Sequence, residues 1–172
     1  MSKQIRAPLS AADRFEIEDL ISEYCRIVDR KAYSQFGRIF SFDITINVVI
    51  QELTFQGIAS FKKFLEKTKS FSSDRMHFTS NIALRAADKG RVVGLAYWHS
   101  TATHKGVPIV EGGFYEMSFE KLGGKWKFKT MSIYHKYRTR ISIDSWNTVG
   151  FPGSDSRSSK DTTIFAQLKE WF

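Results

Sequence analysis

Four consecutive stretches in the second half of the chain have the composition of β-strands, and together they constrain the fold more than any other feature. The stretches are MHFTSNIALRA (76–86), GRVVGLAYWHSTATH (90–104), VPIVEGGFYEMSFEKL (107–122) and KWKFKTMSIYHKYRT (125–139). β-Branched and aromatic residues, which favour strands, recur in each of them. The link LGGKW between the last two predicts a tight hairpin, because paired glycines accept the positive φ of such turns. This half of the chain therefore predicts a long antiparallel meander.

The first half of the chain predicts a helix that begins near residue 11. Ser10 and Asp13 resemble a capping box in which Asp replaces the usual Glu. Apolar residues then recur at steps of three and four along one helical face: Ile17, Leu20, Ile21, Tyr24 and Val28. An amphipathic helix of this kind buries its apolar stripe against a core.

Shorter elements fill the interval between this helix and the meander. AYSQFGRIF (32–40) predicts a short helix, DITINVVIQ (43–51) and ELTF (52–55) predict strands, and residues 58–69 return to helical spacing. Helices followed by a meander are typical of an α+β domain in which one sheet curls around a helical side.

The domain organisation follows from the length of the chain and from a change in its composition. A chain of 172 residues suits one domain with a single core, which we expect over 10–145. Residues 1–9 are expected to form a flexible N-terminus. Residues 146–172 are expected to form a tail, because this segment begins rich in serine, glycine and aspartate. The end of this tail, IFAQLKEWF, regains apolar residues and could form a short helix.

Composition argues against several classes of function. The net charge of +8 comes from basic residues scattered along the chain, which favours a solvated basic surface over a nucleic-acid site. No apolar run approaches the roughly 18 residues that span a membrane, and the N-terminus lacks a hydrophobic signal core, so a cytoplasmic protein is expected. The only cysteine, Cys25, is expected to be a buried small hydrophobe. The histidines lack the spacing of metal ligands, so no metal site is expected.

Two polar residues on or beside the apolar helical stripe call for an explanation. The hydroxyl of Tyr24 lies within the stripe and needs a hydrogen-bond partner if it is buried. Asp29 flanks the stripe near the end of the helix, where the negative end of the helix dipole disfavours a carboxylate. This placement suggests a specific partner for Asp29, in either a structural or a catalytic contact.

His77 is the candidate partner of Asp29, because the strand that carries it has one polar face. Alternation along this strand places two sets of side chains on opposite faces: His77, Thr79 and Asn81 on one, and Phe78, Ser80 and Ile82 on the other. The polar set would face solvent in an ordinary sheet, or line an internal cavity in a sheet curled into a cone. The strand alone leaves both arrangements open.

The order of elements and two short motifs resemble a known family. Two helices, strands, a third helix and a meander closing with GGFYEMSFEKLGGKWKF resemble the SnoaL-like branch of the nuclear transport factor 2-like superfamily. Within it, YCRIVDRKAY and MHFTSN are similar to active-site segments shared by scytalone dehydratase, bile-acid 7α-dehydratase and hexachlorocyclohexane dehydrochlorinase. The resemblance covers about residues 10–140. It implies a cone-shaped, curved mixed or antiparallel sheet wrapped around N-terminal helices, with an internal apolar pocket.

The resemblance also implies a catalytic set. Asp29 and His77 fall on the family's aspartate-histidine dyad, and Tyr24 falls on the tyrosine of the bile-acid enzyme. In such a dyad the carboxylate fixes the imidazole tautomer, so that His77 can remove a proton next to a carbonyl. Tyr24 would donate a hydrogen bond to the oxygen that gains charge in the transition state.

Six further residues are candidates for the substrate-binding lining of the pocket: Phe40, Val48, Tyr97, His99, Tyr115 and His135. By the resemblance, His135 falls near an arginine of the bile-acid enzyme, and Tyr115 falls on an asparagine of scytalone dehydratase. Val48 stands where both dehydratases carry a second tyrosine. Tyr97 and His99 are included because they share a face of one strand, and Phe40 because it supplies an aromatic wall.

Together these features predict a small cofactor-independent lyase of the dehydratase type. Its substrate is expected to be hydrophobic and carbonyl-containing, of a polycyclic, terpenoid or polyketide-like kind. An isomerase or cyclase of the same fold would differ only in where the proton is returned. A non-catalytic small subunit or ligand-binding module is the alternative from a different class. Relatives in the lyase branch imply a homo-oligomer, with a trimer favoured over a dimer.

Overall fold

A computed structural model describes residues 8–140 of the chain. Two α-helices and six strands follow one another along these residues: α1 (Ala11–Asp29), β1 (Phe40–Val48), β2 (Leu53–Gln56), α2 (Gly57–Thr68), β3 (Ser72–Ala86), β4 (Val92–His104), β5 (Val107–Leu122) and β6 (Lys125–Arg140). The expected flexible N-terminus falls largely outside the described residues. The expected tail and its short helix lie wholly outside them.

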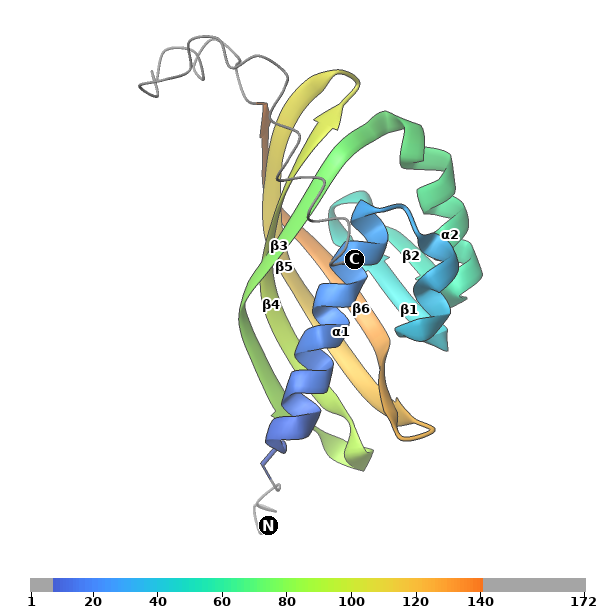
Figure 1. The fold of residues 1–172 in the computed structure, drawn as a ribbon, viewed down its shortest axis with the longest axis vertical. Helices are drawn as coiled ribbons and strands as arrows, with labels where there is room; N and C mark the ends of the chain where they lie inside the picture. Colours follow the sequence, from blue (N-terminus) through green and yellow to red (C-terminus); the bar gives the residue numbers. More distant parts are fainter. Residues whose placement is uncertain (1–7, 141–172) are drawn as a thin grey trace, which may run out of the picture. The chain divides into compact units, whose positions relative to one another are not determined.

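The six strands form one curved, open sheet, and α1 lies along its concave face (Figure 1). The strand order is β2-β1-β6-β5-β4-β3, in which β1 and β6 run parallel and all other neighbours run antiparallel. This arrangement confirms the predicted α+β class and the curved mixed sheet around a helical side. The predicted meander is the run from β3 to β6, and its last hairpin turns at Gly123 and Gly124, both with positive φ.

The apolar stripe of α1 fills the concave side of the sheet, as its spacing predicts. Ile17 and Ile21 are fully buried, and Tyr24 and Val28 are nearly so. They belong to one core that also holds large aromatic residues of the sheet, such as Phe119 and Phe128. Cys25 is buried among them as expected, and burial raises the pKa of its thiol to about 12.

Two of the predicted short elements differ from the observed ones. The helix expected over 32–40 is a 3₁₀ helix at Tyr33–Arg38, after which β1 begins at Phe40. The strand expected over 43–51 ends at Val48, and residues 49–51 form a 3₁₀ turn. The β-branched residues of that segment favour a strand by composition, but a tight turn is needed to pair β1 with β2.

A β-bulge in β3 changes the faces that strict alternation assigns. Asn81 has a φ of 51°, and the pairing with β4 shifts register between Ser80 and Ala83. His77 and Thr79 share one face as expected, and the structure turns this face inward. Asn81 is exposed instead, while Ile82 packs against the core. The prediction that Asn81 shares the face of His77 is therefore wrong. The extra residue of the bulge lies after Ser80 and reverses the alternation of side chains from there on.

The first turn of α1 is tied to the β5–β6 hairpin through Asp13. The Ser10 hydroxyl caps the helix by accepting a hydrogen bond from the Asp13 backbone N–H at 3.1 Å, which confirms the predicted cap. The Asp13 carboxylate in turn accepts hydrogen bonds from Lys121 Nζ and Trp126 Nε1, each at 2.7 Å. These hydrogen bonds, that of Lys121 first, lower the pKa of Asp13.

We expect Asp13→Asn to lower the Tm by a few degrees at pH 7. Because the pKa of Asp13 is lowered in the folded state, its stabilisation is complete above the ordinary value of 3.8 and is lost as the pH falls below it. Thermal melts at pH 7 and at steps down to pH 2 should show the two proteins converging. Asp19→Asn, at an exposed position of the same helix, is the control. A difference in Tm that does not depend on pH would contradict this role.

Candidate active site

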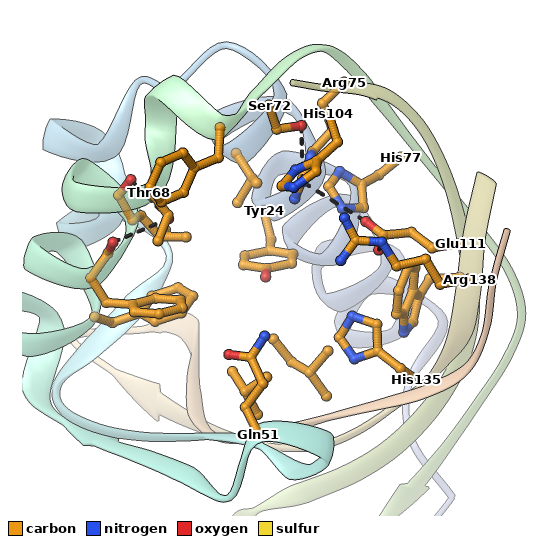
Figure 2. A pocket seen from close by; sticks show the side chains of 18 of the residues that line it. Tyr24, Gln51, Thr68, Ser72, Arg75, His77, His104, Glu111, His135 and Arg138 are labelled. Atoms are coloured by element: carbon orange, nitrogen blue, oxygen red, sulfur yellow. Dashed lines mark hydrogen bonds and ion pairs between the residues drawn. The ribbon is translucent and has the colours of Figure 1, made fainter. Parts of the chain in front are cut away.

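A cavity of about 260 Å³ lies between α1, α2 and the concave face of the sheet (Figure 2). One wall is apolar and comes mainly from α2, through Phe61, Phe64 and Leu65. The opposite wall comes from β3 to β6 and carries most of the polar side chains. The cavity therefore combines an apolar surface with a few convergent polar groups, which is the usual composition of a ligand site.

His77 and Asp29 are joined by two hydrogen bonds at the wall of this cavity. Asp29 is the last residue of α1, and one of its carboxylate oxygens accepts the backbone N–H of His77 at 2.9 Å. The other oxygen lies 2.5 Å from His77 Nδ1. The two side chains are 7% and 18% exposed for His77 and Asp29, so the contact is largely shielded from water. These two bonds satisfy a carboxylate that the helix dipole would otherwise destabilise.

The contact with Asp29 sets the tautomer of His77. An ionised carboxylate can only accept hydrogen bonds, so the proton of the neutral imidazole must sit on Nδ1. The lone pair is then on Nε2, and His77 lines the cavity. The arrangement therefore supplies a proton acceptor at the cavity wall, oriented by a buried carboxylate.

Tyr24 points its hydroxyl into the open centre of the cavity (Figure 2). Its ring is held edge-on by Tyr115, with the ring centres 5.9 Å apart at 89°, and by Phe40 at 6.0 Å. Burial raises the pKa of Tyr24 and that of Tyr115. Both phenols therefore stay protonated at neutral pH and are hydrogen-bond donors.

His135 and Trp98 form a second polar pair on the sheet side of the cavity. Their rings meet edge to face, with centres 5.0 Å apart. Neither Nδ1 of His135 nor Nε1 of Trp98 has a hydrogen-bond partner within residues 8–140. Burial lowers the pKa of His135, so this imidazole is neutral at pH 7.

The structure brings five predicted site residues to the cavity lining and places Asp29 directly behind His77. The five are Tyr24, Val48, His77, Tyr115 and His135.

Among the described residues, no group of three or more His, Cys, Asp or Glu side chains is placed to hold a metal ion. No helix within residues 8–140 combines the length and apolar character needed to cross a membrane.

Tyr97 and His99 do not line the cavity, so that prediction is wrong. Both are exposed on the outer face of the sheet, where His99 stacks on Phe78 with ring centres 4.8 Å apart. Side chains alternate along β4, and the inward set contains Trp98 and Ser100 instead. The shared face of Tyr97 and His99 was predicted correctly, but it is the face turned away from α1.

Phe40 also lies outside the cavity lining, contrary to prediction. It is 2% exposed and packs behind Tyr24, against Phe36, Phe61 and Phe128. Phe40 therefore supports the ring of Tyr24 from the core and does not face the ligand space. An aromatic residue at the start of a strand gives no sign of which of these two positions it takes.

Several polar residues of the cavity lining were missed from the sequence: Gln51, Arg75, His104, Glu111 and Arg138. Arg75 could have been found, because it lies two residues before His77 on the same strand. Arg138 could not, because strict alternation would place it on the opposite face of β6 from His135. It reaches the cavity only because β6 shifts register against β5 between Gly112 and Gly113. This bulge requires glycine, since a Cβ at Gly113 would overlap the carbonyl oxygen of Tyr134.

Comparison with known proteins finds a matching family model and many similar structures. The model of the SnoaL-like domain matches residues 10–132. Hexachlorocyclohexane dehydrochlorinase LinA-type3 from Novosphingobium barchaimii superposes with a TM-score of 0.71 at 21% identity, over 77% of this chain and 92% of that one. A putative scytalone dehydratase from Novosphingobium aromaticivorans gives 0.69 at 19% identity, over 77% and 89%.

A more distant structure shares the same fold. ActVI-ORFA from Streptomyces coelicolor superposes with a TM-score of 0.60 at 13% identity, over 73% of this chain and 98% of that one. A comparison with curated protein sequences finds no match. At these identities the similar structures establish the fold alone.

The tautomer of His77 can be tested directly by nitrogen-15 NMR of the histidine rings. We expect the neutral ring to carry its proton on Nδ1. Asn at position 29 would offer one oxygen, to the backbone N–H of His77, and would turn its amide N–H toward Nδ1. Asp29→Asn should therefore move the proton of His77 to Nε2.

The exposed ring of His99 is an internal control in the same spectra and should keep its tautomer in both proteins. An Nε2-protonated His77 in the unmodified protein would contradict the orientation inferred from the contact.

Proposed function

The chain belongs to the family of SnoaL-like domains, and from this premise we propose that it is a small lyase that eliminates water, or a comparable leaving group, from a hydrophobic substrate. The observation that carries the proposal is the contact of His77 with Asp29 at the wall of a partly apolar cavity. Two of the similar structures are named a dehydrochlorinase and a scytalone dehydratase, and both names denote eliminations.

The proposed reaction needs one base and one hydrogen-bond donor. His77 Nε2 takes a proton from the carbon next to a carbonyl, and Asp29 stabilises the imidazolium that forms. The electron pair of the broken C–H bond moves toward the carbonyl oxygen, which accepts a hydrogen bond from Tyr24. The electron pair then returns to form the carbon-carbon double bond, the leaving hydroxyl departs, and the proton on His77 goes to it as water. Every proton in this scheme is carried by the chain and the substrate.

The surroundings of these groups suit this chemistry. Tyr24 is kept as a neutral donor by burial, and no hydrogen bond within residues 8–140 occupies its hydroxyl. Aromatic and aliphatic side chains of α2 form the wall across the cavity. We therefore propose a hydrophobic carbonyl-containing substrate of polycyclic, terpenoid or polyketide-like character.

We expect His77→Gln to lower kcat by about 10²- to 10⁴-fold, the usual contribution of a general base. The assay would use a panel of hydrophobic β-hydroxy ketones and β-chloro ketones, each with and without a carboxylate, with loss of water or chloride followed by mass spectrometry. His99→Gln, a histidine on the outer face of the same sheet, is the matched control and should keep full activity.

The products separate the alternative functions. An isomer of unchanged mass would indicate an isomerase or cyclase, in which His77 returns the proton to carbon. A panel that binds but is never turned over, with equal affinity in the His77→Gln variant, would favour a ligand-binding module and contradict the lyase.

Tyr24→Phe should reduce kcat by about 10²-fold or more through loss of the donor to the developing oxyanion. Since no partner within the described residues loses a hydrogen bond, the Tm should change by less than a few degrees. Tyr134→Phe is the control, because its hydroxyl donates to Glu116 on the outer face at 3.0 Å. Equal effects of the two variants on kcat would exclude a specific role for Tyr24.

A further inference from the structure

Two arginines flank one buried glutamate at one end of the cavity (Figure 2). Arg75 comes from β3, Glu111 from β5 and Arg138 from β6. The arginine side chains are 28% and 50% exposed, whereas that of Glu111 is 7% exposed. The neighbouring imidazole of His104 lines the same region. Two positive charges and one negative charge therefore leave this end of the cavity with an excess of positive charge.

The guanidinium groups are held near Glu111 but their donors are mostly unused. Arg75 Nη2 and Arg138 Nε each lie 3.8 Å from a Glu111 oxygen, which is an ion-pair distance too long for a hydrogen bond. Glu111 instead accepts a hydrogen bond from Ser100 at 3.3 Å. Within residues 8–140, one hydrogen bond from Arg75 to Ser72 is the only one these two guanidiniums donate. Each guanidinium has five N–H donors, so most of them are available to a ligand.

We propose that Arg75 and Arg138 bind an anionic group of the ligand, and that the cavity therefore takes an amphipathic molecule. Its apolar part lies against Phe61, Phe64 and Leu65, and its carboxylate, sulfonate or phosphate accepts hydrogen bonds from the guanidinium N–H donors that Glu111 leaves unused. Glu111 holds both guanidiniums at this end of the cavity by electrostatic attraction. This proposal depends on the proposed function in one respect: it takes the ligand to be the substrate on which His77 acts.

Physical chemistry favours arginine for this role. The planar guanidinium matches an oxyanion with two parallel N–H donors, and such charge-assisted hydrogen bonds are about twice as strong as neutral ones. A site shielded on one side by the cavity wall strengthens them further. The net charge of +8 also favours the approach of an anion to the protein.

Two fluorescent probes that share one ring system test the proposal. Anilinonaphthalene sulfonate carries an anionic group, and phenylnaphthylamine lacks it. We expect the unmodified protein to bind the sulfonate at least about tenfold more tightly than the neutral probe. Arg75→Gln and Arg138→Gln should each remove most of this preference while the affinity for the neutral probe changes less than about twofold, since the apolar wall is intact.

Arg85→Gln is the matched control, because it removes the same charge from an exposed position of β3. It should leave the preference for the sulfonate unchanged. Equal binding of the two probes by the unmodified protein would overturn the proposal. So would an Arg85→Gln variant that loses as much affinity as Arg138→Gln, since the effect would then be one of overall charge.

The same assay on His77→Gln separates this inference from the proposed lyase activity. The anion preference should persist in that variant, because His77 makes no part of the arginine site. If the preference persists and no panel compound is turned over by the unmodified protein, the lyase proposal fails and the anion site stands. If turnover occurs but both probes bind equally, the anion site fails and the lyase proposal stands.

Discussion

Two carboxylates at opposite ends of α1 hold the helix against the concave face of the sheet. Asp13 in the first turn accepts hydrogen bonds from Lys121 and Trp126 near the β5–β6 hairpin. Asp29 at the last residue accepts two from His77 on β3. The apolar stripe supplies the burial free energy, but a smooth stripe tolerates sliding and rotation. The two charged ends fix the position of the helix along the sheet, and with it the place at which Tyr24 enters the cavity.

Burial favours the neutral form of three titratable groups of the cavity. It raises the pKa of Tyr24 and Tyr115 and lowers that of His135, so all three are neutral at pH 7. Within residues 8–140, the Asp, Glu, Lys and Arg side chains at the cavity are Asp29 behind the wall and the cluster of Arg75, Glu111 and Arg138. A ligand would therefore meet neutral donors around its reacting part and a fixed positive charge at its outer end. Such separation lets one small cavity orient an amphipathic molecule without burying an unpaired charge.

The sequence was most informative where one helix or one regular strand carried the signal. The stripe of α1, its Ser10 cap and the unusual placement of Asp29 follow from local spacing. The pairing of Asp29 with His77 was a hypothesis that the family resemblance supported, and the sequence did not establish their contact. Predictions failed where the geometry departed from simple alternation or where two faces were equally plausible. Asn81 lies in a bulge, and Tyr97 and His99 occupy the outer face of β4. The exposed aromatic residues on that face have the same composition as the lining of a pocket, so composition does not distinguish the two faces.

By itself, the sequence determined the elements, their order, the amphipathic helix and the residues capable of acid-base chemistry, because these depend on propensity and spacing along one segment. Only the tertiary structure decided which face of each strand turns toward α1 and which side chains meet from β3, β5 and β6. The bulge at Gly113 shows the reason. One extra residue brings both His135 and Arg138 to the inner face of β6, and that shift depends on close contact between neighbouring strands, not on any property of β6 alone.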